Sequence, residues 1–130
     1  MAPSGAPRIL LVEDDGLLAE VVAGLLEPLG GVRWADNAEE ALRLLPSSTW
    51  ELVVADIELP GMNGIEMIER LKRDYPHTST LIVSGRASFD YAIEAIRAGA
   101  DDYMTKPLEP EALVAKAREH DLVVGGAAGL

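Results

Sequence analysis

Acidic, basic and hydroxyl side chains follow the apolar runs of this sequence in a pattern that suits phosphoryl chemistry. Glu13 and Asp14 come directly after one apolar run, Asp56 ends another, and two more are followed by Ser84 and Lys106. Carboxylates brought together repel one another unless a hard divalent cation such as Mg²⁺, or a lysine, neutralises them. The cation and Lys106 would also offset the charge of a phosphoryl group, to which Ser84 can donate a hydrogen bond. An aspartate carboxylate can itself accept a phosphoryl group covalently.

These side chains converge only if the apolar runs are neighbouring parallel strands. Short apolar runs bounded by turn residues are typical of strands buried on both faces, and each run here precedes apolar residues at helical spacing. The predicted strands cover residues 8–12, 32–35, 52–56, 80–83 and 101–105. Helices between strands impose parallel pairing and cover both faces, which predicts a three-layer α/β fold. In the common strand order 2-1-3-4-5, the first and third strands, which both end in acids, lie side by side.

Capping residues and apolar spacing predict the helix limits and their inward faces. The predicted initiating residues, from the first helix to the fifth, are Asp14 or Asp15, Asp36 or Asn37, Gly64, Ser88 and Pro110. The fourth helix is expected to direct Ala92, Ile93 and Ile96 towards the sheet, because these residues recur at helical spacing.

The composition limits the class of protein. With 130 residues, 48% of them hydrophobic, the chain can form one domain with a core. A net charge of −11 argues against direct nucleic-acid contact, which needs a basic surface. The sequence has no cysteine, no apolar signal core at its start, and no apolar run near the roughly 20 residues of a membrane span. We expect a cytoplasmic protein with no membrane segment, a flexible leader at residues 1–7 and a frayed, Gly/Ala-rich tail at residues 120–130.

Four segments resemble those of the receiver domain of two-component response regulators. They are residues 9–15 (ILLVEDD), 53–64 (VVADIELPGMNG), 82–85 (IVSG) and 99–107 (GADDYMTKP). Each segment alone is a weak signal, but all four in this order and at these spacings are specific. The resemblance covers about residues 8–119 and implies the flavodoxin-like (βα)5 fold of that family, with strand order 2-1-3-4-5.

The resemblance implies a phosphorylation-controlled signalling switch. Asp56 would take a phosphoryl group from a phosphohistidine on a sensor histidine kinase or a histidine phosphotransfer protein. Asp14 and Asp56 would bind Mg²⁺ directly, Glu13 would support it through water, and the backbone carbonyl of Glu58 would be a further ligand. The chain would not be a conventional enzyme, because its catalysis would be limited to phosphoryl transfer to Asp56 and to its own dephosphorylation.

The same resemblance implies how the signal leaves the site. Lys106 would pair with the phosphoryl group, Ser84 would move towards it, and Tyr103 would swing inward behind it. That shift would alter the face made by the fourth helix, the fifth strand and the fifth helix, which is the usual output surface in the family. Whether phosphorylation also drives homodimerisation through this face is left open by the sequence.

Glu58 departs from the commonest pattern of the family and keeps an alternative open. It adds an acid beside the pocket and is expected to change the lifetime of the phosphorylated state, in a direction that the sequence does not fix. It also stands two residues after Asp56, where aspartyl-type phosphatases carry an acid/base residue. Against that class, Leu59 and Pro60 replace the favoured hydroxyl residue, and no cap domain is present. A nucleotide- or flavin-binding domain ranks last, because no Gly-rich loop follows the first strand.

Other residues receive a structural interpretation. We interpret Trp34 and Trp50 as packing or surface residues, and the acids at positions 39, 40, 66, 69 and 94 as exposed helix faces. No output domain fits after residue 119, so the chain is expected to be either a stand-alone receiver or a piece of a larger regulator. The sequence names no cognate kinase and no target.

Overall fold

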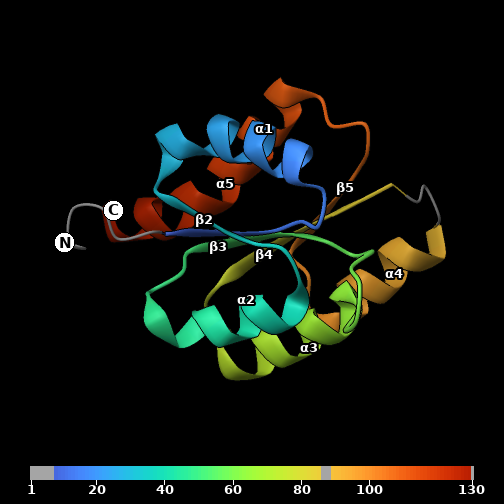
Figure 1. Cartoon of the computed structure of the whole chain (residues 1–130). Coiled ribbons are helices and arrows are strands. Elements are labelled where there is room, and N and C mark those ends of the chain that lie inside the picture. Colours follow the sequence, from blue (N-terminus) through green and yellow to red (C-terminus); the bar gives the residue numbers. More distant parts are fainter. Residues whose placement is uncertain (1–7, 86–88, 130) are drawn as a thin grey trace.

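A five-stranded parallel sheet lies between two layers of helices (Figure 1) in the computed structural model, which describes residues 8–85 and 89–129. The strands are β1 (Ile9–Val12), β2 (Val32–Ala35), β3 (Leu52–Asp56), β4 (Ser79–Ser84) and β5 (Asp102–Thr105). The helices are α1 (Gly16–Leu26), α2 (Ala38–Leu44), α3 (Gly64–Asp74), α4 (Phe89–Ala98) and α5 (Pro110–Gly129), with 3-10 turns η1 (Glu27–Leu29) and η2 (Leu45–Ser47). The strand order β2-β1-β3-β4-β5 confirms the predicted α/β fold.

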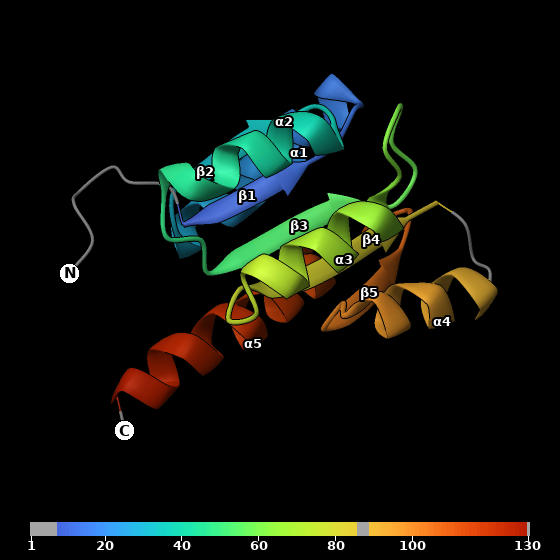
Figure 2. The same ribbon diagram turned by 90° about the horizontal axis from the view of Figure 1, so that it is seen from below.

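Each face of the sheet carries its own apolar cluster. α1 and α5 cover one face, and α2, α3 and α4 cover the other, as Figures 1 and 2 show from two directions. β1 and β3 are buried along their whole length, which explains why their sequences are continuously apolar rather than alternating. Within β1, Leu11 packs with the α1–α5 cluster and Leu10 with the cluster under α2, α3 and α4.

Side-chain caps begin three of the helices. Asp15 accepts hydrogen bonds from the backbone N–H groups of Leu17 and Leu18, so Asp15 rather than Asp14 caps α1. Asn37 caps α2 and Asn63 caps α3 in the same way. The predicted cap Ser88 and the predicted leader at residues 1–7 lie outside the described residues. Because α1 takes its cap from Asp15, the side chain of Asp14 is left for another role.

The prediction for the inward face of α4 is wrong. Ala95 is buried, whereas Ile93 and Ile96 are 40% and 51% exposed. Ile93 and Ile96 share a helical face at i, i+3 spacing, but α4 packs Tyr91, Ala95 and Ala98 into the apolar cluster under α2, α3 and α4. Spacing fixes which residues share a face, not which face is buried. The same holds in α1, where Leu17 is 80% exposed.

The start of β5 differs from the prediction, and α5 is long. β5 begins at Asp102, because the side chain of Asp101 bonds to other elements. Its Oδ2 accepts hydrogen bonds from the backbone N–H of Thr80 at 2.8 Å and from Lys72 Nζ at 3.2 Å. α5 runs from Pro110 to Gly129, and fraying of its last residues stays a prediction. A helix already nucleated extends at low cost, and this segment contains Leu, Val and Ala besides its glycines. Among helices of the described chain, none has the length and apolar character to cross a bilayer.

Gly64 sets the distance between the end of β3 and the start of α3. A Cβ at this position would lie 2.6 Å from Ile57 Cα and 2.8 Å from the backbone oxygen of Asp56. The N–H of Gly64 donates to the backbone oxygen of Ile57 at 3.0 Å, which closes the loop onto the strand. The close approach therefore requires glycine, and it fixes the backbone that carries Asp56.

We expect Gly64→Ala to lower the free energy of unfolding by about 1–3 kcal/mol, because the added methyl meets backbone atoms that cannot move aside. The matched control is Gly24→Ala in α1, where no atom lies within 4 Å of the added Cβ. That control should raise stability by up to about 1 kcal/mol, since alanine has the higher helix propensity. Urea denaturation of both variants measures the difference. Equal midpoints for the two variants would contradict the role given to Gly64.

Candidate functional site

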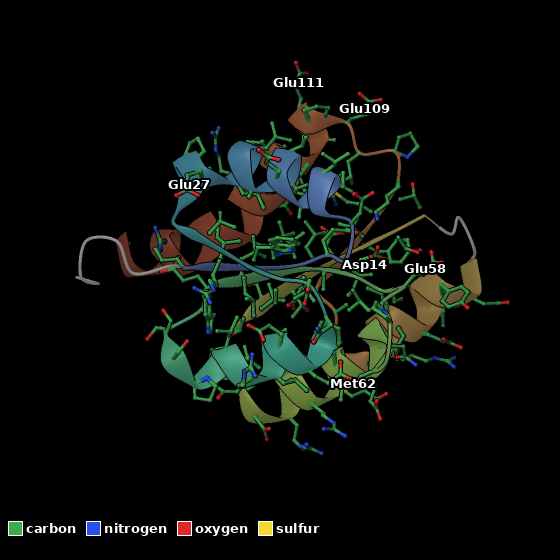
Figure 3. All side chains as sticks on the ribbon, in the orientation of Figure 1. Asp14, Glu27, Glu58, Met62, Glu109 and Glu111 are labelled. Carbon is green, nitrogen blue, oxygen red and sulfur yellow. The ribbon has the colours of Figure 1, made fainter. Side chains whose placement is uncertain are left out.

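Strand register brings the predicted acidic residues together. Val12 of β1 pairs with Ala55 of β3, so the next residues along the two strands, Glu13 and Asp56, emerge side by side at the carboxyl end of the sheet. Asp14 follows one residue later, before α1 begins at Gly16. Figure 3 shows Asp14 and Glu58 at this same end of the sheet, on the loops that follow β1 and β3. Adjacent parallel strands therefore supply a common edge.

Three carboxylates gather at this edge. One oxygen from each of Glu13, Asp14 and Asp56 lies within 4.8 Å of the other two. Glu13 and Asp56 are buried, with exposed fractions of 4% and 5%, whereas Asp14 faces solvent. Burial raises the pKa of Glu13, and the charge of Asp56 raises it further, although hydrogen bonds from the Asp15 N–H and Lys106 act in the opposite direction. Removing the proton from Glu13 is therefore costly unless a cation is close by.

Lys106 reaches across the sheet edge to these acids. Its Nζ lies 2.8 Å from Asp56 Oδ2 and 3.2 Å from Glu13 Oε2. Burial alone would lower the pKa of Lys106, but hydrogen bonds and charge from Asp56 and Glu13 outweigh it and raise that pKa, so the amine stays protonated. The backbone N–H of Lys106 donates to the Ser84 carbonyl at 2.8 Å, and the peptide bond to Pro107 is cis. Lys106 thus links the end of β5 to the ends of β1 and β3.

The Asp56 carboxylate is held at both oxygens. Oδ2 accepts from Lys106, and Oδ1 accepts from the backbone N–H of Glu58 at 2.9 Å. The carboxylate is therefore oriented before any ligand arrives, because each of its oxygens accepts a hydrogen bond. The role of the Glu58 carbonyl as a metal ligand stays a prediction.

Ser84 and Tyr103 come from β4 and β5, on the side of β3 away from β1. The Ser84 side chain is fully buried, and its Oγ donates to Glu58 Oε1 at 3.4 Å. Tyr103, in β5, is half-buried and packs against the apolar cluster under α2, α3 and α4. The structure thus brings Glu58 into contact with Ser84, a contact that the spacing of the two residues did not predict.

Two further residues hold the loops that carry the acids. The indole Nε1 of Trp34 donates to the backbone oxygen of Glu13 at 2.7 Å, and Glu39 Oε2 accepts from the backbone N–H of Met62 at 3.2 Å. The sequence predicts a packing or surface role for Trp34 and an exposed position for Glu39. Glu39 is exposed as predicted, but both residues bond to backbone atoms, and such bonds leave no signal in residue spacing.

The donor set fits a hard divalent cation. Carboxylate oxygens are the ligands that Mg²⁺ prefers, and one oxygen from each of the three acids lies within 4.8 Å of the other two. The negative cluster, the adjacent lysine and the buried hydroxyl together match what a phosphoryl group requires: charge compensation and a hydrogen-bond donor.

Comparison with known proteins agrees with this geometry. The family model of the response regulator receiver domain matches residues 9–118. The chain is 39% identical to the response regulator protein FleR of Pseudomonas aeruginosa over 119 residues, which are 90% of this chain and 25% of FleR. It is 34% identical to the transcriptional regulatory protein FixJ of Bradyrhizobium diazoefficiens, covering 83% of this chain and 53% of FixJ. The chain therefore spans a quarter to about half of these curated relatives.

Solved structures show the same likeness. The CheY-like receiver domain protein of Methanospirillum hungatei superposes with a TM-score of 0.83 at 33% identity, over 89% of this chain and 94% of that one. The BeF3-activated receiver domain of DrrB, a Thermotoga maritima protein, gives 0.83 at 30% identity, over 88% and 97%. The matched family model is that of a receiver domain, and nothing in these comparisons supports the phosphatase alternative. The chain belongs to the receiver domain family of two-component response regulators.

Proposed function

We propose that Asp56 is the phosphoryl acceptor of this receiver domain. A carboxylate oxygen of Asp56 attacks the phosphorus of a phosphohistidine on a sensor histidine kinase or a histidine phosphotransfer protein. A P–O bond forms as the P–N bond breaks, and the bonding electrons leave on the imidazole nitrogen. The observation that carries the proposal is the bridge from Lys106 Nζ to Asp56 Oδ2 and Glu13 Oε2, at 2.8 Å and 3.2 Å. This bridge holds a positive charge beside the acceptor oxygen, where the phosphoryl oxygens arrive.

The cation of this site is proposed to be Mg²⁺. Asp14 and Asp56 bind it directly, Glu13 supports it through water, and the Glu58 carbonyl completes the protein ligands. The bound ion neutralises negative charge on the transferred phosphoryl group. The exposed position of Asp14 supports this assignment, because Mg²⁺ keeps several waters and needs an open side of the site.

Phosphorylation is proposed to act through Ser84 and Tyr103. The Ser84 hydroxyl leaves its hydrogen bond to Glu58 and donates to a phosphoryl oxygen instead. Tyr103 moves inward from its half-buried position. The surface of α4, β5 and α5, which carries the exposed Ile93 and Ile96, then changes and meets a downstream protein or a second copy of the chain. One new charged group thereby biases a two-state equilibrium. A cytoplasmic location and a receiver unit of residues 8–119 are part of this proposal.

The acceptor assignment predicts a covalent product. Incubation of the protein with Mg²⁺ and a small acyl phosphate should add close to one phosphoryl group per chain, measured by intact mass. Asp56→Asn should add none, because an amide oxygen is a poor nucleophile. Asp36→Asn, which changes an exposed aspartate, is the control and should label as wild type does. Rapid multiple turnover on varied phosphate esters would point to a phosphatase instead.

The metal assignment predicts different results for two adjacent aspartates. Asp14→Asn should raise the Mg²⁺ dissociation constant on the order of 10-fold or more, because it removes a charged ligand. Asp15→Asn should leave it nearly unchanged, since asparagine also caps helices and Asp15 is outside the acidic cluster. The increase in unfolding temperature with added MgCl₂ measures each constant. A similar loss of affinity in both variants would refute the assignment of Asp14.

Glu58 is expected to oppose the phosphorylated state. Its carboxylate accepts a hydrogen bond from the Ser84 hydroxyl, which is the donor proposed for the phosphoryl group. The negative charge of Glu58 also repels the phosphoryl group. We therefore expect Glu58→Gln to bind the phosphoryl analogue beryllofluoride about 2- to 10-fold more tightly than wild type. Glu69→Gln, an exposed acid of α3, should not change the affinity. Weaker binding by Glu58→Gln would show that Glu58 assists the site.

A further inference from the structure

Trp34 holds the metal-site loop through a contact that the proposed function does not use. This residue lies in β2, the edge strand beside β1, and its indole Nε1 donates to the Glu13 carbonyl at 2.7 Å. The next residue of β2, Ala35, accepts the Glu13 N–H at 3.0 Å. Both backbone groups of Glu13 are therefore held from β2, one by the main chain and one by a side chain.

The held carbonyl controls the direction of Asp14. It belongs to the planar peptide unit that joins Glu13 to Asp14, so fixing the oxygen also fixes the N–H and Cα of Asp14. Among the described residues, no hydrogen bond holds the Asp14 carboxylate itself, which faces solvent. The position of this carboxylate therefore depends on the peptide before it and on the Asp15 cap after it.

The hydrogen bond from Trp34 to the Glu13 carbonyl acts against the repulsion among the three carboxylates. Three carboxylates lie within 4.8 Å of one another, and Lys106 contacts Glu13 and Asp56. The exposed Asp14 can relieve the repulsion by rotating its peptide away from the cluster. The indole bond opposes this rotation, because turning the peptide would leave the carbonyl without its donor.

Trp50 provides an internal comparison. Its indole also donates to backbone carbonyls, to Leu45 at 3.0 Å and to Leu44 at 3.3 Å, but it is 5% exposed and belongs to the apolar core. Trp34 is 45% exposed, so it contributes less to packing than a buried tryptophan. Trp34 and Trp50 therefore both donate an indole hydrogen bond to a backbone carbonyl. They differ in burial, and Trp34 alone of the two bonds to a residue of the acidic cluster.

We propose that Trp34 is a positioning residue for the divalent-cation site, acting through the Glu13 carbonyl on the direction of Asp14. The proposal rests on the proposed function, because it assumes that the acidic cluster binds Mg²⁺. It assigns no contact between Trp34 and the cation or the phosphoryl group. Without the indole N–H, the peptide unit before Asp14 can rotate away from the cluster. Binding of Mg²⁺ must then return this peptide to its position, which weakens the apparent affinity.

The test compares Trp34→Phe with Trp50→Phe. Each protein is titrated with MgCl₂, and the rise of its unfolding temperature gives a dissociation constant that is separate from its stability without metal. Trp34→Phe is expected to raise this constant about 3- to 10-fold, the range of a single net hydrogen bond, with near wild-type stability in the absence of Mg²⁺. Trp50→Phe is expected to lose stability and keep the wild-type constant.

A second control and a local measurement complete the experiment. Leu17→Ala removes an exposed apolar residue of α1 and leaves the indole bond intact, so its constant should equal that of wild type. Amide hydrogen exchange at Asp15, whose N–H donates to Glu13 Oε1 at 3.2 Å, should be faster in Trp34→Phe than in wild type and unchanged in Leu17→Ala.

The outcomes distinguish this proposal from the function on which it rests. An unchanged Mg²⁺ constant in Trp34→Phe, with wild type binding the ion, would overturn the positioning role and leave the cation site standing. Stability lost without any change in the constant would make Trp34 a structural residue like Trp50. Absence of Mg²⁺-dependent stabilisation in wild type would overturn the cation site, and the positioning role with it, before any substitution is compared.

Discussion

Three carboxylates repel one another at one end of the sheet, and the contacts around the site act against this repulsion. Glu13 and Asp56 are almost fully buried, and the burial of like charges is tolerated only when a counter-charge is close. Lys106 provides part of that counter-charge. The remaining negative charge faces solvent through Asp14, and it is this excess that suits the site to a divalent cation.

The counter-charge comes from the residue after β5, which is not a neighbour of the strands that carry the acids. Lys106 follows β5, which is separated from β3 by β4 in the sheet. Its ammonium therefore connects the acids to the strand that carries Tyr103 and lies beside α4. A change of charge at Asp56 alters the partner of Lys106 directly. Lys106 therefore gives the acidic edge a direct contact with the residue that follows β5.

Contacts to backbone atoms keep the acids in place. Trp34 holds the carbonyl of Glu13, Glu39 binds the N–H of Met62, and Gly64 lets α3 approach the end of β3. The N–H of Glu58 orients the Asp56 carboxylate. These bonds fix the loops after β1 and β3, where the repulsion would otherwise act. The site is therefore a cluster of like charges on a backbone that neighbouring elements hold in place.

The sequence alone determined the order of the elements and the parallel sheet, because apolar period and crossover helices are local properties of the chain. The meeting of Glu13, Asp14 and Asp56 at one edge followed from the strand order that the family resemblance implies. Tertiary structure decided the rest. Which face of α4 is buried depends on what packs against it, so Ile93 and Ile96 are exposed despite their spacing. The bonds from Trp34 to Glu13 and from Ser84 to Glu58 join residues far apart in sequence. Such contacts depend on the distances between strands and loops in the folded chain, which residue types and spacing do not encode.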